Sequence, residues 1–455
     1  MLSTLFISRI QFAFTISFHI LFPAFSIGLA TFLAIMEGFW LKTQKHKYYA
    51  ICRFYSKIFA LTFGMGIISG IVMEFQLGTN WASYAKTVGS VLGSLFTYEV
   101  MTAFFIEAGF LGVMLFGWKK VSPKLHYIST LAVLFGVTLS AFWILAANSW
   151  MQTPAGAHMV NGSFVVDSWK AVIINHSTIY RFIHMMLAAY ITTLLVVAGI
   201  SAHYLIKNKH IQISRFCVYF ALVGLSVLAP LQLFIGDQVG KEVHDNQPIK
   251  TAAIEGVWQS QRHAPFLIFA VPDQKAQKNH LAFGVPGMAS FINTHDFNGK
   301  LQGLSSVPRN EQPPVDIVFY SFRIMLGIGL ALFLLIGAGW ALHFKKQLFH
   351  SKLFLRCLTL FAPLGFAAIE TGWFVAETGR QPWIVYQLLK TSQSVSDVSL
   401  RNTLISLTLI VLVYGVIFGF FYFKYLIKTI RKGPENLESI SDMPFAYMGQ
   451  HQEGA

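Results

Sequence analysis

The residues of this sequence with the most distinctive chemistry are histidines and carboxylates that interrupt long apolar stretches. Of the 15 histidines in the 455-residue chain, His19 and His184 lie well inside such stretches. A charge at the centre of a bilayer costs at least about 2.5–3.5 kcal/mol on insertion scales, so each ionisable group there needs a specific reason. The carboxylates in or at the ends of these stretches are Glu37, Glu74, Glu99, Glu107, Glu370 and Glu377.

Several of these side chains fall at similar depths. If the stretches are helices with a rise of about 1.5 Å per residue, His19 lies about 12 Å, His184 about 8 Å and Met325 about 10 Å from the membrane face at which their helices start. The carboxylates near the same face are Glu99, Glu377 and, two turns deeper on one helix side, Glu107. We therefore expect one layer of ligand-type residues near one face of the membrane.

This layer favours redox chemistry. Neutral imidazole and thioether groups are ligands of low-spin heme iron, and a methionine ligand raises its reduction potential. A histidine or glutamate opposite an open position suits an iron that binds oxygen, and helix bundles commonly hold such cofactors. A structural alternative stays open, because an intramembrane histidine also serves as a hydrogen-bonded helix contact and Met325 alone is typical of apolar filling. The residues by themselves predict a redox or proton-coupled membrane protein.

The elements that position the layer are predicted from composition. The chain is 55% hydrophobic and 12% charged, whereas soluble proteins carry roughly 25% charged residues. A spanning helix needs about 20 mostly apolar residues. Nine stretches qualify, at 11–40, 56–78, 95–117, 125–147, 179–206, 215–236, 318–344, 354–376 and 400–427. We predict an all-α polytopic membrane protein with nine transmembrane helices in bundles.

The loops between these stretches predict an orientation. Basic residues concentrate after the first, third, fifth, seventh and ninth stretches, as in Lys42, Lys45, Lys119, Lys207, Lys345, Arg356 and Arg431. Such loops are cytoplasmic, so we expect the N-terminus outside and the C-terminus cytoplasmic. The net charge of +14 is explained by this pattern, and we expect no nucleic-acid partner.

The organisation follows from the spans. We expect transmembrane helices 1–6 in residues 1–236, with His19, Glu99, Glu107 and His184 among them. Residues 237–317 form one long loop outside the membrane, and a loop of this length is usually functional. Residues 318–455 hold helices 7–9 and a cytoplasmic tail.

Short strings add a family resemblance. They are Gly-Trp-Phe-Val-Ala-Glu at 372–377, Gly-Arg-Gln-Pro-Trp at 379–383, Asn-Ser-Trp-Met-Gln-Thr-Pro at 148–154, Phe-Arg-Ile-Met at 322–325, Arg-Phe-Ile-His at 181–184, Gly-Asp-Gln at 236–238 and Lys-Thr-Ala-Ala-Ile-Glu at 250–255. Together they resemble subunit I of cytochrome bd-type ubiquinol oxidases over nearly the whole chain. The loop at 237–317 is short for this family and resembles its short-loop branch, which includes cyanide-insensitive oxidases.

The resemblance implies three hemes: a low-spin heme b, a high-spin heme b and a d-type chlorin. His184 and Met325 would be the axial iron ligands of the low-spin heme, and Arg323 would lie beside it. His19 and Glu377 would bind the other two irons, in an order left open. Two further residues are implied near the hemes: Trp373 for electron transfer between them, and Arg380 as a propionate partner. From the residues alone, Arg380 fits equally well a second role, as an interfacial anchor beside Trp383.

The resemblance also implies where protons and substrate go. Glu99, Glu107 and Ser140 would lie on the proton supply to the oxygen-reducing site. Lys250 and Glu255 would contact quinol, with Glu255 as a proton acceptor. Expected partners are ubiquinol or menaquinol, dioxygen, membrane lipid, an oxidase subunit II and a small single-helix subunit, in the bacterial inner membrane.

Three other functions explain the sequence less well, and the first two need more intramembrane histidines than His19 and His184. A heme–copper oxidase needs about six intramembrane histidines, and a cytochrome b of the bc type needs two histidine pairs on two helices. The remaining alternative is a proton-coupled transporter that uses Glu99, Glu107 and Glu377 as relays. Transporters often show internal repeats and broken helices at the bilayer midplane, whereas this polar layer lies off-centre and we find no repeat.

Overall fold

The protein is a bundle of long helices. The computed structural model describes residues 3–435, and within them nine helical stretches are long and apolar enough to cross a membrane. They are α1 (Thr4–Thr43), α2 (His46–Thr79), a third span over Ala82–Phe116, α6 (Pro123–Gln152), a fifth span over Trp169–Ile206, α9 (Ile211–Asn246), α12 (Val315–Phe344), an eighth span over Lys352–Thr378 and a ninth over Leu400–Lys432. The predicted all-α polytopic class and all nine predicted stretches are confirmed.

Four of these spans are composite. The third consists of α3 (Ala82–Val88), a π-helical turn Gly89–Gly93, α4 (Ser94–Glu99), a second π-helical turn Val100–Phe104 and α5 (Phe105–Phe116). The fifth is α7 (Trp169–Ile173) with α8 (Thr178–Ile206), the eighth is α13 (Lys352–Phe361) with α14 (Leu364–Thr378), and the ninth is α15 (Leu400–Ile410), a π-helical segment Val411–Phe418 and α16 (Gly419–Lys432). Such π-helical turns are frequent at functional sites, and one begins directly after Glu99.

Serine side chains mark the starts of several helices. Ser3, Ser122, Ser351 and Ser399 each accept a hydrogen bond from a backbone N–H of the first turn. This satisfies one of the donors that an α-helix leaves free at its N-terminus. Inside the membrane the helical backbone satisfies its own polar groups, which is why apolar runs of this length fold as helices.

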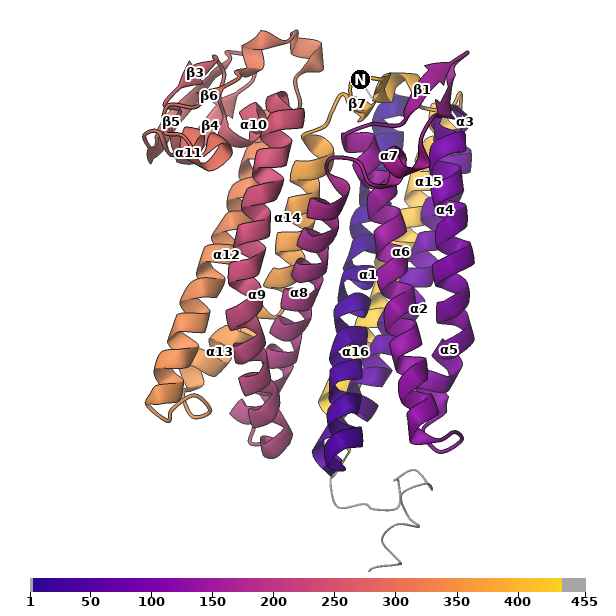
Figure 1. The fold of residues 1–455 in the computed structure, drawn as a ribbon, viewed down its shortest axis with the longest axis vertical. Helices are drawn as coiled ribbons and strands as arrows, with labels where there is room; N and C mark the ends of the chain where they lie inside the picture. Colours follow the sequence, from indigo (N-terminus) through magenta and orange to yellow (C-terminus); the bar gives the residue numbers. More distant parts are fainter. Residues whose placement is uncertain (1–2, 436–455) are drawn as a thin grey trace, which may run out of the picture.

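The helices form two groups that meet along α1 and α8 (Figure 1). One group contains α1, α2, α4–α6, α15 and α16, and the other contains α8, α9 and α12–α14. A large apolar core lies between α1, α2, α6 and α8, and a second lies between α8, α9, α12 and α13. The central helices α1 and α8 are the most buried of the spans.

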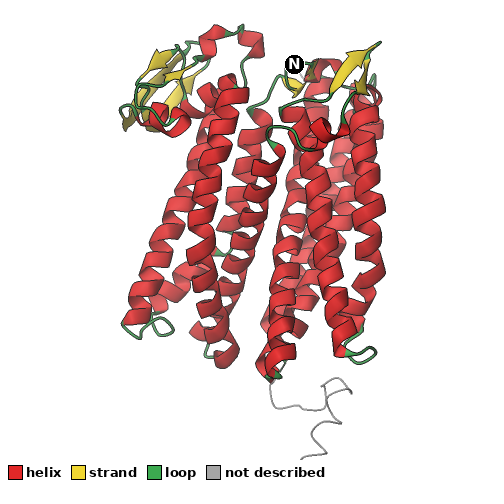
Figure 2. Ribbon diagram, in the orientation of Figure 1, coloured by secondary structure: helices red, strands yellow, loops and turns green. Residues whose placement is uncertain are grey.

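The strands gather at one end of the bundle, the same end as the N-terminus (Figure 2). We call it the loop end. Its antiparallel pairs are β1 (Ala157–Val160) with β2 (Ser163–Val166), β3 (Gln261–Arg262) with β6 (Lys300–Leu301), β4 (Phe266–Asp273) with β5 (Lys278–Val285), and β7 (Trp383–Val385) with β8 (Leu389–Lys390). Because α9 continues to Asn246 and α12 begins at Val315, the long loop covers residues 247–314, with α10 (Pro248–Glu255) and α11 (Met288–Thr294) inside it.

Candidate functional site

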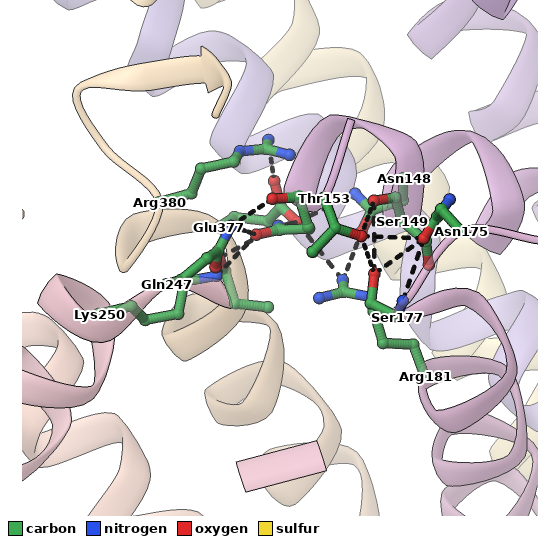
Figure 3. A network of polar contacts seen from close by, with 12 residues as sticks. Asn148, Ser149, Thr153, Asn175, Ser177, Arg181, Gln247, Lys250, Glu377 and Arg380 are labelled. Atoms are coloured by element: carbon green, nitrogen blue, oxygen red, sulfur yellow. Dashed lines mark hydrogen bonds and ion pairs between the residues drawn. The ribbon is translucent and has the colours of Figure 1, made fainter. Parts of the chain in front are cut away.

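A polar network at the loop end is centred on the Glu377 carboxylate (Figure 3). Asn148 Nδ2 and Gln152 Nε2 each donate to Glu377 Oε1 at 3.0 Å. Arg380, almost one helical turn further along the chain, donates to Oε2. Arg181 Nη2 lies 4.0 Å from Oε1. The network thus joins α6, α8 and the end of α14 around one carboxylate.

Positive charge and unused donors accumulate around this carboxylate. Lys250 Nζ donates to Gln152 Oε1 at 2.6 Å, so three cations share a region whose acids are Glu377 and Glu242. Among the described residues, Arg380 Nε and Nη1 and Arg181 Nε are buried without a hydrogen-bond partner. Arginine pairs strongly with carboxylates, so the carboxylates of a bound group, such as heme propionates, fit these free donors.

His184 and Met325 lie in the group of helices formed by α8, α9, α12 and α14. The Gln232 Nε2 lies 3.3 Å from His184 Nε2, and His184 Nδ1 is buried with no partner in the described part of the chain. Glycine leaves room beside both side chains, because a Cβ at Gly236 would lie 3.4 Å from His184 Cε1 and one at Gly372 would lie 3.1 Å from Met325 Sδ. An unsatisfied imidazole beside glycines fits a bulky bound group such as heme.

The surroundings of His19 favour one tautomer of its imidazole. His19 Nδ1 lies 2.9 Å from Ser69 Oγ, and Ser69 Oγ donates its own proton to the Met65 carbonyl at 2.8 Å. Ser69 therefore accepts a hydrogen bond from Nδ1–H, which leaves the Nε2 lone pair free for a ligand bond. Gly70 keeps the ring accessible, since a Cβ there would lie 3.2 Å from His19 Cε1.

Trp373 connects the surroundings of the two histidines. It packs in a small apolar cluster that contains Ile20 and Met185. Ile20 follows His19 on α1, and Met185 follows His184 on α8. The cluster thus joins Trp373 on α14 to both histidine-bearing helices.

Glu99 and Glu107 both face α6. Ser140 Oγ donates to Glu99 Oε1 at 2.7 Å. Glu107 packs against Gly136, where a Cβ would lie 2.6 Å from Glu107 Cγ, and its Oε1 is buried without a hydrogen-bond partner in residues 3–435. Since Gly136 and Ser140 are one turn apart on α6, the two acids line the same side of that helix.

The structure separates the two residues expected to contact quinol. Lys250 bonds to Gln152 in the network around Glu377. Glu255, at the other end of α10 and 1% exposed, accepts from Asn293 Nδ2 at 3.1 Å and from Arg323 Nη2 at 3.3 Å. The helix α10 therefore connects two distinct polar groups.

Burial shifts the pKa values of two α10 residues, Lys250 and Glu255. Burial lowers the pKa of the Lys250 ammonium well below its ordinary range, and Arg181 and Arg380 add to this effect. Burial raises the pKa of the Glu255 carboxyl, and Arg323 acts in the opposite direction. Perturbed pKa values of this kind are typical of functional sites.

Arg323 links the long loop to the helix of Met325. Besides its contact with Glu255, its Nε donates to the Leu267 carbonyl at 3.0 Å, and its Nη1 donates to the Ile254 carbonyl. Its guanidinium carbon lies 3.8 Å from the centre of the Phe319 ring. The charge of Arg323 is thus fixed between Glu255 and α12, two positions before Met325.

Four members of the Glu377 network were given no individual role from the sequence, although the quoted strings at 148–154 and 181–184 contain three of them. They are Asn148, Gln152, Arg181 and Gln247, whose Nε2 donates to the Gln152 carbonyl at 2.6 Å. Arg181 carried a usable signal, because it is a charge inside the apolar stretch 179–206. The other three are uncharged, and their roles depend on contacts between helices distant in sequence.

Comparisons with known proteins agree over nearly the full length. The profile of the family described as "Cytochrome bd terminal oxidase subunit I" matches residues 7–434. The chain is 34% identical to cytochrome bd ubiquinol oxidase subunit 1 of Bacillus subtilis (strain 168), over 97% of each chain. It is 31% identical to cytochrome bd-II ubiquinol oxidase subunit 1 of Escherichia coli (strain K12), over 95% of this chain and 97% of that one.

A solved structure gives the same result for the fold. The structure of bd oxidase from Geobacillus thermodenitrificans matches with a TM-score of 0.88 and 26% identity, covering 95% of this chain and 99% of that one. The family and the nine apolar helices of the described residues identify a multi-pass protein of the bacterial inner membrane. The chain belongs to the cytochrome bd terminal oxidase subunit I family.

Proposed function

We propose that this chain is the heme-bearing subunit of a quinol oxidase that reduces dioxygen to water and generates a proton-motive force. The observation that carries the proposal is the Glu377 network with its unused arginine donors (Figure 3), together with His19, His184 and Met325, each beside a glycine, in a family of terminal oxidases. Family membership gives no support to the transporter alternative.

The heme-binding residues are proposed individually. His184 and Met325 would ligate the iron of a low-spin heme b, and His19 and Glu377 would ligate the irons of a high-spin heme b and a d-type chlorin. When bound, the hemes carry electrons from quinol to dioxygen. Arg380 and Arg181 hold free donors toward propionates, and Arg323 holds a positive charge near Met325. Trp373 packs in one apolar cluster with residues of the His19 and His184 helices, and there it would favour electron transfer.

Quinol oxidation is proposed at the long loop. Oxidation of one quinol releases two electrons and two protons, and a carboxylate with a raised pKa can accept a proton and release it again. Glu255 is buried, has a raised pKa and is held by Arg323 and Asn293. Lys250, on the same short helix, would contact quinol from the Glu377 side. The relatives are named as ubiquinol oxidases, and either ubiquinol or menaquinol fits this chemistry.

Proton supply to the oxygen-reducing site is proposed along α6. Glu107 and Glu99 face Gly136 and Ser140. Buried carboxylates arranged in sequence can relay protons through a membrane protein. Uptake from one side and release on the other makes a proton-motive force without a separate pump.

The orientation and assembly complete the proposal. The loop end would face outside and the opposite end the cytoplasm, as the basic loops require. Residues 1–236 would hold transmembrane helices 1–6, residues 237–317 the quinol-binding segment, and residues 318–455 transmembrane helices 7–9 with a cytoplasmic tail. The tail residues 436–455 lie outside the described part of the chain. The chain would assemble with an oxidase subunit II and a small single-helix subunit.

The proposal is tested by reconstituting the purified oxidase complex in liposomes and supplying quinol. We expect quinol-dependent oxygen consumption with acidification on the side of the long loop. A complex with full heme content that consumes no oxygen with either ubiquinol or menaquinol would contradict the proposal.

A further inference from the structure

We infer that the hairpin of β4 and β5 is embedded in the lipid bilayer at the loop end, with its apolar base in lipid and its charged tip in water. Figure 1 shows this hairpin on the outer side of α12, away from the group that contains α1 and α6. The inference concerns a lipid-binding surface and does not depend on the oxidase chemistry.

Strand β4 runs alongside α12 in the opposite direction. The hydrogen bonds that fix this alignment, from the start of the helix inward, are Val315 N to Gln274 Oε1 at 3.4 Å, Tyr320 Oη to the Ala270 carbonyl at 3.0 Å, and Arg323 Nε to the Leu267 carbonyl at 3.0 Å. The tip of the hairpin therefore lies level with the end of α12, and its base lies beside the third turn.

Because β4 is aligned with α12, the length of α12 gives the depth of the hairpin in the membrane. The helix has 30 residues, which at 1.5 Å per residue gives about 45 Å, the thickness of a bilayer with its headgroups. Tyr320 and Arg323 then lie about 7.5 Å and about 12 Å below the outer end of the helix. At that depth the base of the hairpin is level with the headgroups and the upper acyl chains.

The exposed side chains of the hairpin change from apolar in its deeper part to charged at its tip. The exposed apolar ones are Ile268 (51%), Phe269 (50%) and Phe283 (68%) toward its base and Leu281 (78%) near the middle of β5. Phe269 and Phe283 are directly opposite each other in the ladder. At the tip, Lys275 and Lys278 are exposed. Contiguous apolar patches on a protein surface mark interaction sites.

Lipid is the occupant that explains this gradient. A protein partner would not require polarity to follow the axis of a membrane-spanning helix, whereas a bilayer does. The apolar base also continues a lipid-facing side of α12, where Ile317 (45%) and Ile324 (50%) are exposed. Aromatic residues near the headgroups and lysines at the aqueous edge are typical of interfacial segments.

The test uses single labelled cysteines in the full oxidase complex, with Cys357→Ser to remove a partly exposed thiol. An environment-sensitive fluorophore is attached at Phe283→Cys, and in a second variant at Leu281→Cys. Matched controls carry it at Lys275→Cys on the tip and at Asn310→Cys, an exposed site elsewhere in the loop. The complexes are placed in nanodiscs of phosphatidylethanolamine and phosphatidylglycerol with brominated or unbrominated acyl chains, and then titrated with iodide.

We expect several-fold lower emission from the labels at Phe283 and Leu281 in brominated lipid, with little quenching by iodide. The labels at Lys275 and Asn310 should show the reverse. The ratio between the two lipids cancels constant quenching by heme. Iodide quenching at the base would place the hairpin in water, and protection from both quenchers would place it under protein. Either result would overturn the inference.

Discussion

Removing the charge of Arg323 should move the pH dependence of quinol oxidation toward higher pH. In Arg323→Gln, Glu255 loses the guanidinium whose Nη2 lies 3.3 Å from its Oε2. Burial already raises the pKa of Glu255, and Arg323 opposes this effect. Without Arg323 the pKa rises further, so Glu255 stays protonated to higher pH. A protonated carboxyl cannot accept a quinol proton. The acid limb of the pH–rate profile therefore moves to higher pH.

The size of this change follows from the distance between the charges. Two unit charges 3.3 Å apart attract by about 5 kcal/mol at an effective dielectric constant of about 20. This is an upper value, because desolvation and relaxation of the site offset part of it. If a fifth of the attraction remains, about 1 kcal/mol, the acid limb moves by about 0.7 pH unit.

The assay is oxygen uptake at saturating quinol across the pH range, with heme content measured on the same preparations. Arg323→Lys is the matched control, because it keeps the charge and loses the planar fork that bonds to Ile254 and Leu267. Its acid limb should stay near that of the unsubstituted chain. Glu255→Gln should lose quinol turnover and retain its hemes. An Arg323→Gln enzyme with normal heme content and an unshifted acid limb would refute the reasoning.

Three further substitutions test other parts of the site. Met325→Leu should convert a low-spin heme to high-spin while the other hemes remain, as seen in absorption and electron paramagnetic resonance spectra; an unchanged low-spin signal would rule out this ligand. Ser69→Ala removes the acceptor for His19 Nδ1–H, and loss of such a supporting bond typically weakens metal-site affinity by about 10–100-fold; unchanged heme retention would exclude the positioning role. Glu107→Gln should slow oxygen reduction at saturating quinol without raising the KM for quinol, and a normal maximal rate would remove Glu107 from proton supply.

The membrane architecture was predictable because it depends on local composition. A run of about 20 apolar residues has few alternatives to a spanning helix in lipid, and all nine predicted stretches appear among the described helices. Exact ends were less predictable. The helix α9 runs past residue 236 to Asn246, where polar residues gave no apolar signal. The π-helical turn that follows Glu99 also has no simple sequence pattern.

The candidate site was predictable only in part. Charged or ligand-type residues inside apolar stretches stand out, which is how His19, His184, Glu99 and Glu107 were found. Neutral partners such as Gln152 do not, because their importance arises from contacts with residues more than 90 positions away. Lys250 and Glu255 share a short helix but contribute to two separate polar groups, and their spacing in the sequence does not indicate this division.

The most direct test of the central claim is the dithionite-reduced minus air-oxidised absorption spectrum of the purified complex. The account predicts b-type heme bands together with a chlorin band in the red. It also predicts that His184→Ala removes the low-spin component while the chlorin band persists. A colourless preparation, or one without the chlorin band, would contradict the account.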